Sequence, residues 1–365
     1  MSVSDPQPPV AAKAAASKAL HAGPRLSNRK KFAFSLLLLL GLALATEAAL
    51  RIADPAILHF ALAARRTHDY RAGCRTDLRP ESSGRFHLTR EDGSTVYDFT
   101  LAVDEIGLRS AEPAGLPQAL HESRPRAIVH CIGDSFTMGW GVESDRSYPA
   151  RLQEGLGLDY LVLNLGVDGI GLLAARERME RVAADFPPAV VLWLFIENDV
   201  AEDEETLAHR ERWALRHAWE RFYADARRRS YLLNVPFALK WTVGLKPRMN
   251  QPEAEDRAEF GTVLDRAAWL AAARRAELPE HATARALLEF HEQCRAIGAD
   301  FRAVFIQSNP ESYSLGRLCL EQRIPMIVAP MPYELRIRND GHLNAEGNRR
   351  LATALAEQVF GAQPE

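Results

Sequence analysis

Apolar runs without alternating polar residues constrain this chain most, because such runs form strands that are covered on both faces of a sheet. They are separated by segments with helical spacing, and that order indicates a parallel sheet with helices on both sides. The sequence therefore predicts an α/β fold whose functional groups follow the carboxyl ends of the strands. The runs are RAIVHCIG (126–133), DYLVLNLG (159–166), AVVLWLFI (189–196), DFRAVFIQ (300–307) and IPMIVAP (324–330).

Other segments carry turn and helix signals. Residues 86–103 predict two short strands around Asp92-Gly93-Ser94, and the polar, proline-containing stretch 110–125 is typical of a linker. Residues 171–185 have helical spacing and stop before FPP. The chain closes with a predicted helix that Asn344 would cap, with Leu351, Leu355 and Val359 on one face.

Residues 200–295 interrupt this rhythm with a long, charged and mostly helical insertion. Leu215, Trp219, Phe222 and Tyr223 recur there at helical spacing. We favour a helix that packs this apolar seam onto the main domain. The alternative is an aromatic lid over a substrate groove.

The N-terminus carries a membrane-targeting signal. Residues 1–31 hold six Lys/Arg against one acid, and fifteen uncharged residues follow at 32–46. Such a pattern is a cleaved signal peptide or a membrane anchor, and the long basic leader favours an anchor with a cytoplasmic N-terminus. A buried core helix is the less favoured alternative. We expect a leader (1–31), an anchor or signal segment (32–52), an N-terminal extension with a short hairpin (53–125) and a catalytic-type domain (126–360).

The net charge and the cysteine spacing bear on whether the chain binds nucleic acid or a metal ion. The formal net charge of −3 offers no basic footprint for nucleic acid. The four cysteines, Cys74, Cys131, Cys294 and Cys319, show no metal-ligand spacing. Cys131 lies in an apolar run and is expected in the core, while a disulfide between two of the others stays open.

A nucleophile and its base can be placed at two loops of this fold. Ser135 follows the first run in Gly133-Asp134-Ser135, and a serine hydroxyl becomes reactive when a base takes its proton. Asp340 and His342 precede the last helix in NDGHLNAEG. Histidine can accept that proton, and a nearby carboxylate can orient the imidazole. Taken alone, Asp-Ser after a strand is most often a helix cap, and the alternative for His342 is a lone histidine in a capping turn.

Two further strand ends offer hydrogen-bond donors. In NLGVDGIG, Asn164, Gly166 and Gly169 follow the second run, and glycine lets a backbone N–H approach an oxyanion closely. Asn198, in FIENDV, ends the third run and can donate from its side-chain amide. Ordinary β-to-α turns are the alternative for both.

The order Gly-Asp-Ser, glycine, Asn-Asp and Asp/His resembles the SGNH (GDSL-type) hydrolase superfamily over roughly residues 100–360. DEIGLRS and FPPAVVLWLFIENDV also look like its membrane-anchored bacterial branch. The resemblance implies a flavodoxin-like, three-layer α/β/α fold with a five-stranded parallel sheet. It implies Ser135 as nucleophile, His342 as base and Asp340 as acid, with an oxyanion hole from the N–H groups of Ser135 and Gly169 and the side chain of Asn198.

Two departures from the family pattern stand out. Glu197 replaces the usual glycine before the asparagine, and we expect it to narrow or re-aim the site. The acid and the histidine are spaced Asp-x-His, with Asn339 at the commoner acid position.

The leading prediction is a membrane-anchored serine esterase, without metal or organic cofactor, that faces the periplasm of a bacterium. Its expected substrate is an acylated small molecule or polysaccharide, such as O-acyl groups of cell-envelope carbohydrate. One alternative is an O-acyltransferase that uses the same residues. Another is a non-catalytic glycan-binding module that keeps the fold; protein partners are unknown.

Overall fold

The computed structural model describes residues 27–71, 75–110, 125–211, 214–259 and 263–361. The chain divides into two compact units, residues 1–54 and 55–365. The predicted linker at 110–125 falls almost wholly outside the described residues, as does Cys74.

The described part of the first unit forms one long helix, α2 (Asn28–Ala53). Ser27 caps it by accepting a hydrogen bond from the N–H of Lys30. Its most apolar window has a mean hydropathy of 2.0 and no buried part, so the helix is long and apolar enough to cross a membrane. At 1.5 Å per residue its 26 residues span about 39 Å, more than a hydrocarbon core. A signal sequence would pass the same test.

The second unit is built on a five-stranded parallel sheet in the order β10-β9-β8-β6-β7. This confirms the predicted fold class, and every apolar run forms one strand. The strands are β6 (Ala127–Gly133), β7 (Tyr160–Asn164), β8 (Val190–Phe195), β9 (Asp300–Phe305) and β10 (Met326–Val328).

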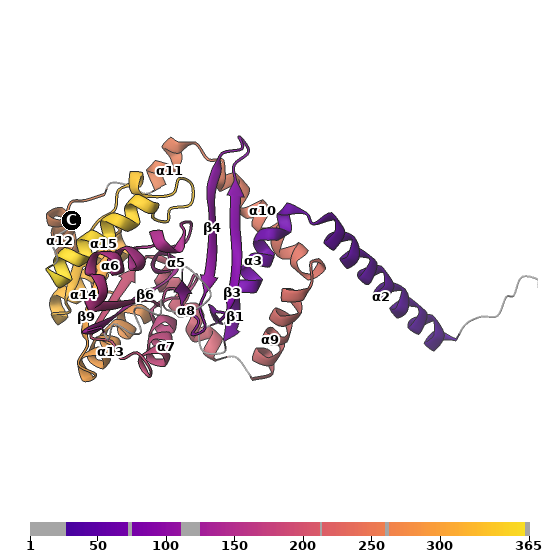
Figure 1. The fold of residues 1–365 in the computed structure, drawn as a ribbon, viewed down its shortest axis with the longest axis horizontal. Helices are drawn as coiled ribbons and strands as arrows, with labels where there is room; N and C mark the ends of the chain where they lie inside the picture. The colour runs from indigo at the N-terminus through magenta and orange to yellow at the C-terminus, as the bar shows by residue number, and fades with distance from the viewer. Residues whose placement is uncertain (1–26, 72–74, 111–124, 212–213, 260–262, 362–365) are drawn as a thin grey trace, which may run out of the picture. The chain divides into compact units, whose positions relative to one another are not determined.

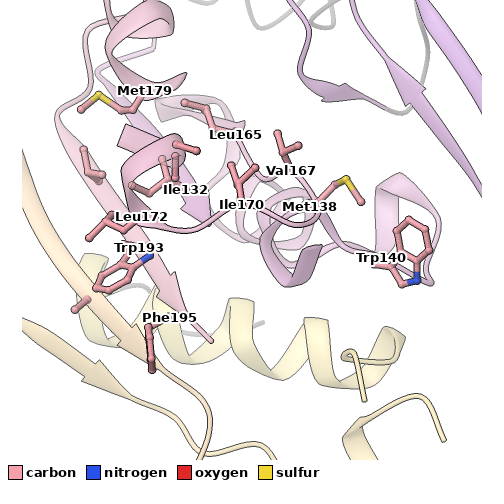
Figure 2. Packing of buried hydrophobic residues seen from close by; sticks show 14 of the residues in the cluster. Ile132, Met138, Trp140, Leu165, Val167, Ile170, Leu172, Met179, Trp193 and Phe195 are labelled. Atoms are coloured by element: carbon pink, nitrogen blue, oxygen red, sulfur yellow. The ribbon is translucent and has the colours of Figure 1, made fainter. Parts of the chain in front are cut away.

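Helices cover both faces of this sheet (Figure 1). One core cluster joins Leu192 and Leu194 of β8 to buried side chains of α6 (Tyr148–Leu156) and α15 (Ala345–Phe360). The other joins the alternate strand residues to α7 (Leu172–Ala183), α13 (Ala282–Ala296) and α14 (Pro310–Gln322). Figure 2 shows part of this second cluster, with Trp193 and Met179. Because every strand is covered on both sides, its residues are apolar without alternation.

The remaining helical elements lie mostly in the predicted insertion. Asn344 caps α15 as expected, accepting a hydrogen bond from the N–H of Gly347 at 2.9 Å. The other elements are α5 (Ser135–Met138), η2 (Ser144–Arg146), η3 (Gly157–Asp159), α8 (Asn198–Arg210), α9 (Ala214–Arg229), η4 (Leu232–Asn234), α10 (Val235–Met249), α11 (Glu253–Glu259), α12 (Arg266–Arg275) and η5 (Tyr333–Leu335).

The N-terminal part of this unit contains the expected hairpin. β3 (Ser82–Thr89) and β4 (Thr95–Val103) pair antiparallel around the Asp92-Gly93-Ser94 turn, and β5 (Arg109–Ser110) adds to β4. It is preceded by η1 (Ala56–Leu58), α3 (His59–Thr67), β1 (His68–Arg71) and β2 (Arg75–Leu78). The rings of Phe86 and Tyr97 pack on Trp140, with centroids 5.0 and 5.9 Å from the centroid of the Trp140 ring. These contacts fix the hairpin beside the carboxyl end of β6.

The prediction for the aromatic seam of α9 is wrong. Trp219 and Phe222 are 63% and 62% exposed, and their tilted rings contact each other, with centroids 5.6 Å apart, instead of entering a core. The helix instead turns Arg227 inward, where it is buried. Helical spacing identified one face of α9 but could not show which face meets the protein.

The described cysteines, Cys131, Cys294 and Cys319, are buried free thiols. Cys131 is therefore a core residue as expected, and no disulfide joins Cys294 to Cys319.

Candidate active site

Ser135 lies at the carboxyl end of β6, in the first turn of α5. The turn into α5 requires glycine at position 133, which has φ +147°; a Cβ there would meet Thr137 Oγ1 at 2.5 Å. Asp134 caps the short helix by accepting a hydrogen bond from the N–H of Phe136 at 2.9 Å. The local sequence therefore holds the serine at the edge of the sheet.

This edge is the topological switch point of the sheet. β6 and β8 are neighbours, but α6 follows β6 on one face while α13 precedes β9 on the other. Loops diverge above such a pair of strands and leave a crevice for ligands. Ser135 follows β6 and Asn198 follows β8, so both flank this crevice.

The structure brings Ser135, His342 and Asp340 into one hydrogen-bonded chain. Nε2 of His342 lies 2.7 Å from Oγ of Ser135, and its Nδ1 contacts Oδ1 of Asp340. In the neutral imidazole, Nδ1–H donates to the carboxylate and leaves Nε2 to accept the serine proton. The Asp-x-His spacing therefore places the carboxylate within reach of the imidazole.

The backbone between η5 and α15 makes this spacing work. Asn339 and Gly341 both have positive φ, +65° and +92°. Arg336 donates a hydrogen bond to the carbonyl of Gly341 at 2.9 Å, and the N–H of Ile337 donates to the carbonyl of His342 at 2.7 Å. This tight loop turns Asp340 toward the imidazole. Asn339, at the commoner acid position, is fully buried and its N–H donates to Asp256 instead.

Carboxylates around His342 set its electrostatics. Burial alone would lower the pKa of His342, but the charge and hydrogen bond of Asp340 outweigh burial and raise this pKa, with smaller contributions from Asp134 and Asp168. Burial raises the pKa of Asp134, which is fully buried. The site therefore favours positive charge on the imidazole.

Asn198 lies beside the serine. Its Nδ2 donates to Oδ2 of Asp134 at 3.2 Å, and Oγ of Ser135 donates to the same oxygen at 3.4 Å. Gly169, with φ +68°, directly follows Asp168, which lines a cavity together with Ser135.

Asn164 and Gly166 pack the loop after β7 against α5. Asn164 donates to the carbonyl of Met138 at 3.3 Å, and a Cβ on Gly166 would meet the N of Met138 at 2.1 Å. Both residues therefore act in packing and do not line the cavity at Ser135.

Glu197 does not narrow the cavity, contrary to expectation. Its side chain is exposed and accepts a hydrogen bond from Nδ2 of Asn309 at 2.5 Å. Its N–H donates to Oε1 of Gln307 at 3.0 Å. The residue therefore turns toward the neighbouring loop after β9 and is not among the residues that line the cavity.

The cavity at Ser135 has a volume of about 260 Å³, and residues outside the serine–histidine–aspartate chain also line it. The hairpin contributes Tyr97, the loop after α5 contributes Trp140, and the end of α10 contributes Arg248 and Met249. The insertion thus reaches the site through α10, whereas the α9 aromatics proposed as a lid do not line this cavity.

Asp168 is a site residue that sequence reasoning missed. It lines the cavity, and its Oδ1 contacts Nε2 of His68, whose Nδ1 lies 2.9 Å from the carbonyl of Ala64. Burial would raise the pKa of Asp168, but His68 outweighs burial and lowers it. The only available signal was an acid in the VDG sequence of the second loop, and nothing in the sequence linked it to His68.

Fold and geometry define a parallel α/β protein that presents a serine, a histidine and an aspartate at its switch point. The model of the GDSL-like Lipase/Acylhydrolase family matches residues 131–350, which is more than half of the chain. The chain therefore belongs to this family and to the SGNH hydrolase superfamily, whose members are ester-hydrolysing enzymes. No curated protein matches the chain.

Similar solved structures are distant. TesA is 16% identical, with 65% of this chain and 99% of that chain covered and a TM-score of 0.36. The psychrotrophic esterase EstA from Pseudoalteromonas sp. is 11% identical, with 64% and 97% covered and a TM-score of 0.38. A carbohydrate acetylesterase family member from Sinorhizobium meliloti is 15% identical, with 65% and 98% covered and a TM-score of 0.32.

Proposed function

We propose that this enzyme is a serine esterase in which Ser135 attacks the ester, His342 is the general base and Asp340 orients it. The hydrogen-bonded chain from Ser135 to Asp340 is the observation that carries the proposal. Oγ of Ser135 bonds to the ester carbonyl carbon while its proton passes to Nε2 of His342. Asp340 then faces the imidazolium that forms.

The oxyanion hole of this proposal uses three donors. The N–H of Ser135, the N–H of Gly169 and Nδ2 of Asn198 would donate to the oxygen that becomes negative. Support comes from Asn198, whose side-chain amide donates to the same carboxylate oxygen of Asp134 as the hydroxyl of Ser135. The tetrahedral intermediate breaks its bond to the alcohol oxygen, which takes the proton from His342. Water repeats the sequence on the acyl-enzyme and releases the carboxylic acid.

Active-site labelling tests the role of Ser135. The full chain in detergent is treated with diethyl p-nitrophenyl phosphate, which forms a Ser135–phosphorus bond as p-nitrophenolate leaves. We expect one diethylphosphoryl adduct on Ser135 by intact and peptide mass spectrometry, and none in Ser135→Ala. Ser94→Ala, a change at an exposed hairpin serine, is the matched control and should label like the wild type. A non-catalytic module would label at no single serine.

The proposed location is the bacterial inner membrane, with α2 as anchor and residues 53–365 in the periplasm. The six Lys/Arg of residues 1–31, which precede the apolar stretch of α2, support a cytoplasmic N-terminus. Acylated carbohydrate of the cell envelope is then the substrate class that we propose. Alkaline phosphatase fused after Glu365 tests the orientation, because it is active only when exported; an inactive but stable fusion would contradict it.

Acyl transfer is the second candidate. The walls beside Ser135 are formed by the buried residues Tyr97, Trp140 and Met249. An apolar wall disfavours water and helps a sugar hydroxyl to compete for the acyl-enzyme. Product analysis with an acyl donor and a polysaccharide acceptor separates the two reactions: free acid indicates hydrolysis and acylated polysaccharide indicates transfer.

A further inference from the structure

A second cavity, of about 360 Å³, lies among α3, β1 and α9. α3 and α9 pack against each other (Figure 1). The His68–Asp168 pair connects the two cavities, because His68 lines this one and Asp168 lines the one at Ser135. We call it the arginine cavity, after Arg65 of α3 and Arg227 of α9, which line it.

The two arginines gather around one ring. The guanidinium carbons of Arg65 and Arg227 lie 5.2 and 4.9 Å from the ring centroid of Phe237. Arg227 is only 9% exposed, and Nη2 of Arg227 donates to Asn234 at 3.1 Å. The Nε atom of each arginine is buried without a hydrogen-bond partner among the described residues. Both guanidinium groups therefore keep an N–H without an acceptor among the described residues.

The acidic residues that line the arginine cavity interact with residues other than Arg65 and Arg227. Oδ1 of Asp69 lies 3.5 Å from Nη1 of Arg228. Oε1 of Glu220 lies 3.1 Å from Nε of Arg216, and its Oε2 accepts a hydrogen bond from the hydroxyl of Tyr70 at 2.7 Å. Asp168 offsets part of the charge of Arg65 but contacts His68. Neither cavity arginine forms an ion pair with a described carboxylate.

A half-buried guanidinium group, that of Arg65, and a buried one, that of Arg227, destabilise each other, because neither is paired with a described carboxylate. Burial, followed by repulsion from Arg227, lowers the pKa of Arg65 to about 10. Buried charges need a partner of opposite sign, and removing such a charge from water is costly when none is present. An anion between the two arginines would supply that partner.

We propose that the arginine cavity binds a phosphate group. The planar guanidinium fork matches phosphate oxygens, and two forks match the two charges of a phosphate monoester. The volume leaves room for more than the phosphate itself. The phosphate can belong to a soluble phosphate ester or to a lipid headgroup. Arg65 follows the last residue of α2, the proposed membrane anchor, by twelve positions, and a lipid headgroup is therefore tested beside a soluble ester.

The first test uses inorganic phosphate on the full chain in detergent, at constant ionic strength set with chloride. We expect saturable binding by calorimetry in the wild type and at least a tenfold loss of affinity in Arg65→Gln and in Arg227→Gln. Arg221→Gln makes the same charge change at an exposed site on α9 and should bind like the wild type. Absence of saturable binding to phosphate and to the vesicles described next, or equal binding by all variants, overturns the proposal.

Two further measurements keep the proposal testable. In phosphate-free buffer, Arg65→Gln should melt at or above the wild-type temperature, because it removes a half-buried charge that repels Arg227 and has no ion pair with a described carboxylate. A lower melting temperature without any phosphate dependence in the wild type contradicts the proposal. Vesicles of phosphatidylglycerol are then compared with vesicles of phosphatidylcholine. Arginine-dependent binding to phosphatidylglycerol vesicles and not to phosphatidylcholine vesicles identifies a headgroup. Saturable binding of inorganic phosphate without binding to either kind of vesicle identifies a soluble ester. These readouts are independent of esterase activity.

Discussion

The carboxylate of Asp168 lines the cavity at Ser135 and contacts the imidazole of His68, which lies 100 positions earlier in the chain. This contact joins the N-terminal part of the second unit to the loop after β7. It also adds a third carboxylate, beside Asp340 and Asp134, to the field at His342. The N-terminal extension is thereby part of the electrostatics of the site.

Replacing Asp168 by asparagine should move the pH dependence of activity. Asp168 raises the pKa of His342, and the general base works only when it is deprotonated, above that pKa. Removing the charge lowers the pKa, so the acid limb of kcat/KM should shift to lower pH. Profiles for p-nitrophenyl acetate check this. Asp92→Asn, in the exposed hairpin turn, is the control, and an unmoved acid limb in Asp168→Asn would contradict the assignment.

The acid assignment predicts a large effect at Asp340. Asp340→Asn should lower kcat by about 10⁴-fold, the loss seen when a triad acid is neutralised, because the imidazole loses its orienting acceptor. The double variant Asp340→Asn with Asn339→Asp should remain inactive. Asn339 is buried, and its Nδ2 donates to the carbonyl of Gln251 at 3.0 Å. Recovery of activity in the double variant would show that position 339 can supply the acid.

Asn198 is expected to stabilise the transition state and not the fold. Asn198→Ala should lower kcat by roughly 100- to 1000-fold with little change in KM, as expected when one oxyanion donor is removed. Steady-state kinetics with the same ester measure both constants. Asn309→Ala, which removes a side chain bound to Glu197 outside the cavity, should leave kcat unchanged. Equal losses in both variants would indicate a structural effect.

Gly133 should be intolerant of any side chain. Gly133→Ala forces a residue with Cβ into φ +147°, close to Thr137 and the carbonyl of Leu194, and should lower the free energy of unfolding by roughly 1–3 kcal/mol or more. Gly155→Ala lies in α6 with nothing near its Cβ and should stabilise the protein by up to about 1 kcal/mol. Denaturant unfolding compares them; equal stability of Gly133→Ala and wild type would contradict the strained turn.

The sheet was predictable because each strand is a short, continuous apolar run. The turn at Asp92-Gly93-Ser94 and the cap at Asn344 were predictable because both depend on local chemistry. The proximity of Ser135 to Asp340 and His342 was predictable because loops after the strands of a parallel sheet converge on one edge, although Asp340 and His342 lie between η5 and α15 and not directly at a strand end. These inferences use neighbours in sequence or a general rule of the fold.

Other features depend on contacts that the sequence does not encode locally. The His68–Asp168 contact joins residues 100 positions apart, and Tyr97 reaches the cavity only because the hairpin packs on Trp140. The aromatic spacing of α9 misled because its buried face is polar: Glu220 bonds to Tyr70, and Arg227 lies in the arginine cavity. A hydrophobic pattern cannot reveal a helix that buries its charged side.

Ser135 is proposed to accept an acyl group from an ester, and hydrolysis of p-nitrophenyl acetate by the full chain in detergent tests this role most directly. We expect steady release of p-nitrophenol by the wild type and by Ser94→Ala, and release at the background rate by folded Ser135→Ala. Equal rates for wild type and Ser135→Ala, whether both high or both at background, would contradict it.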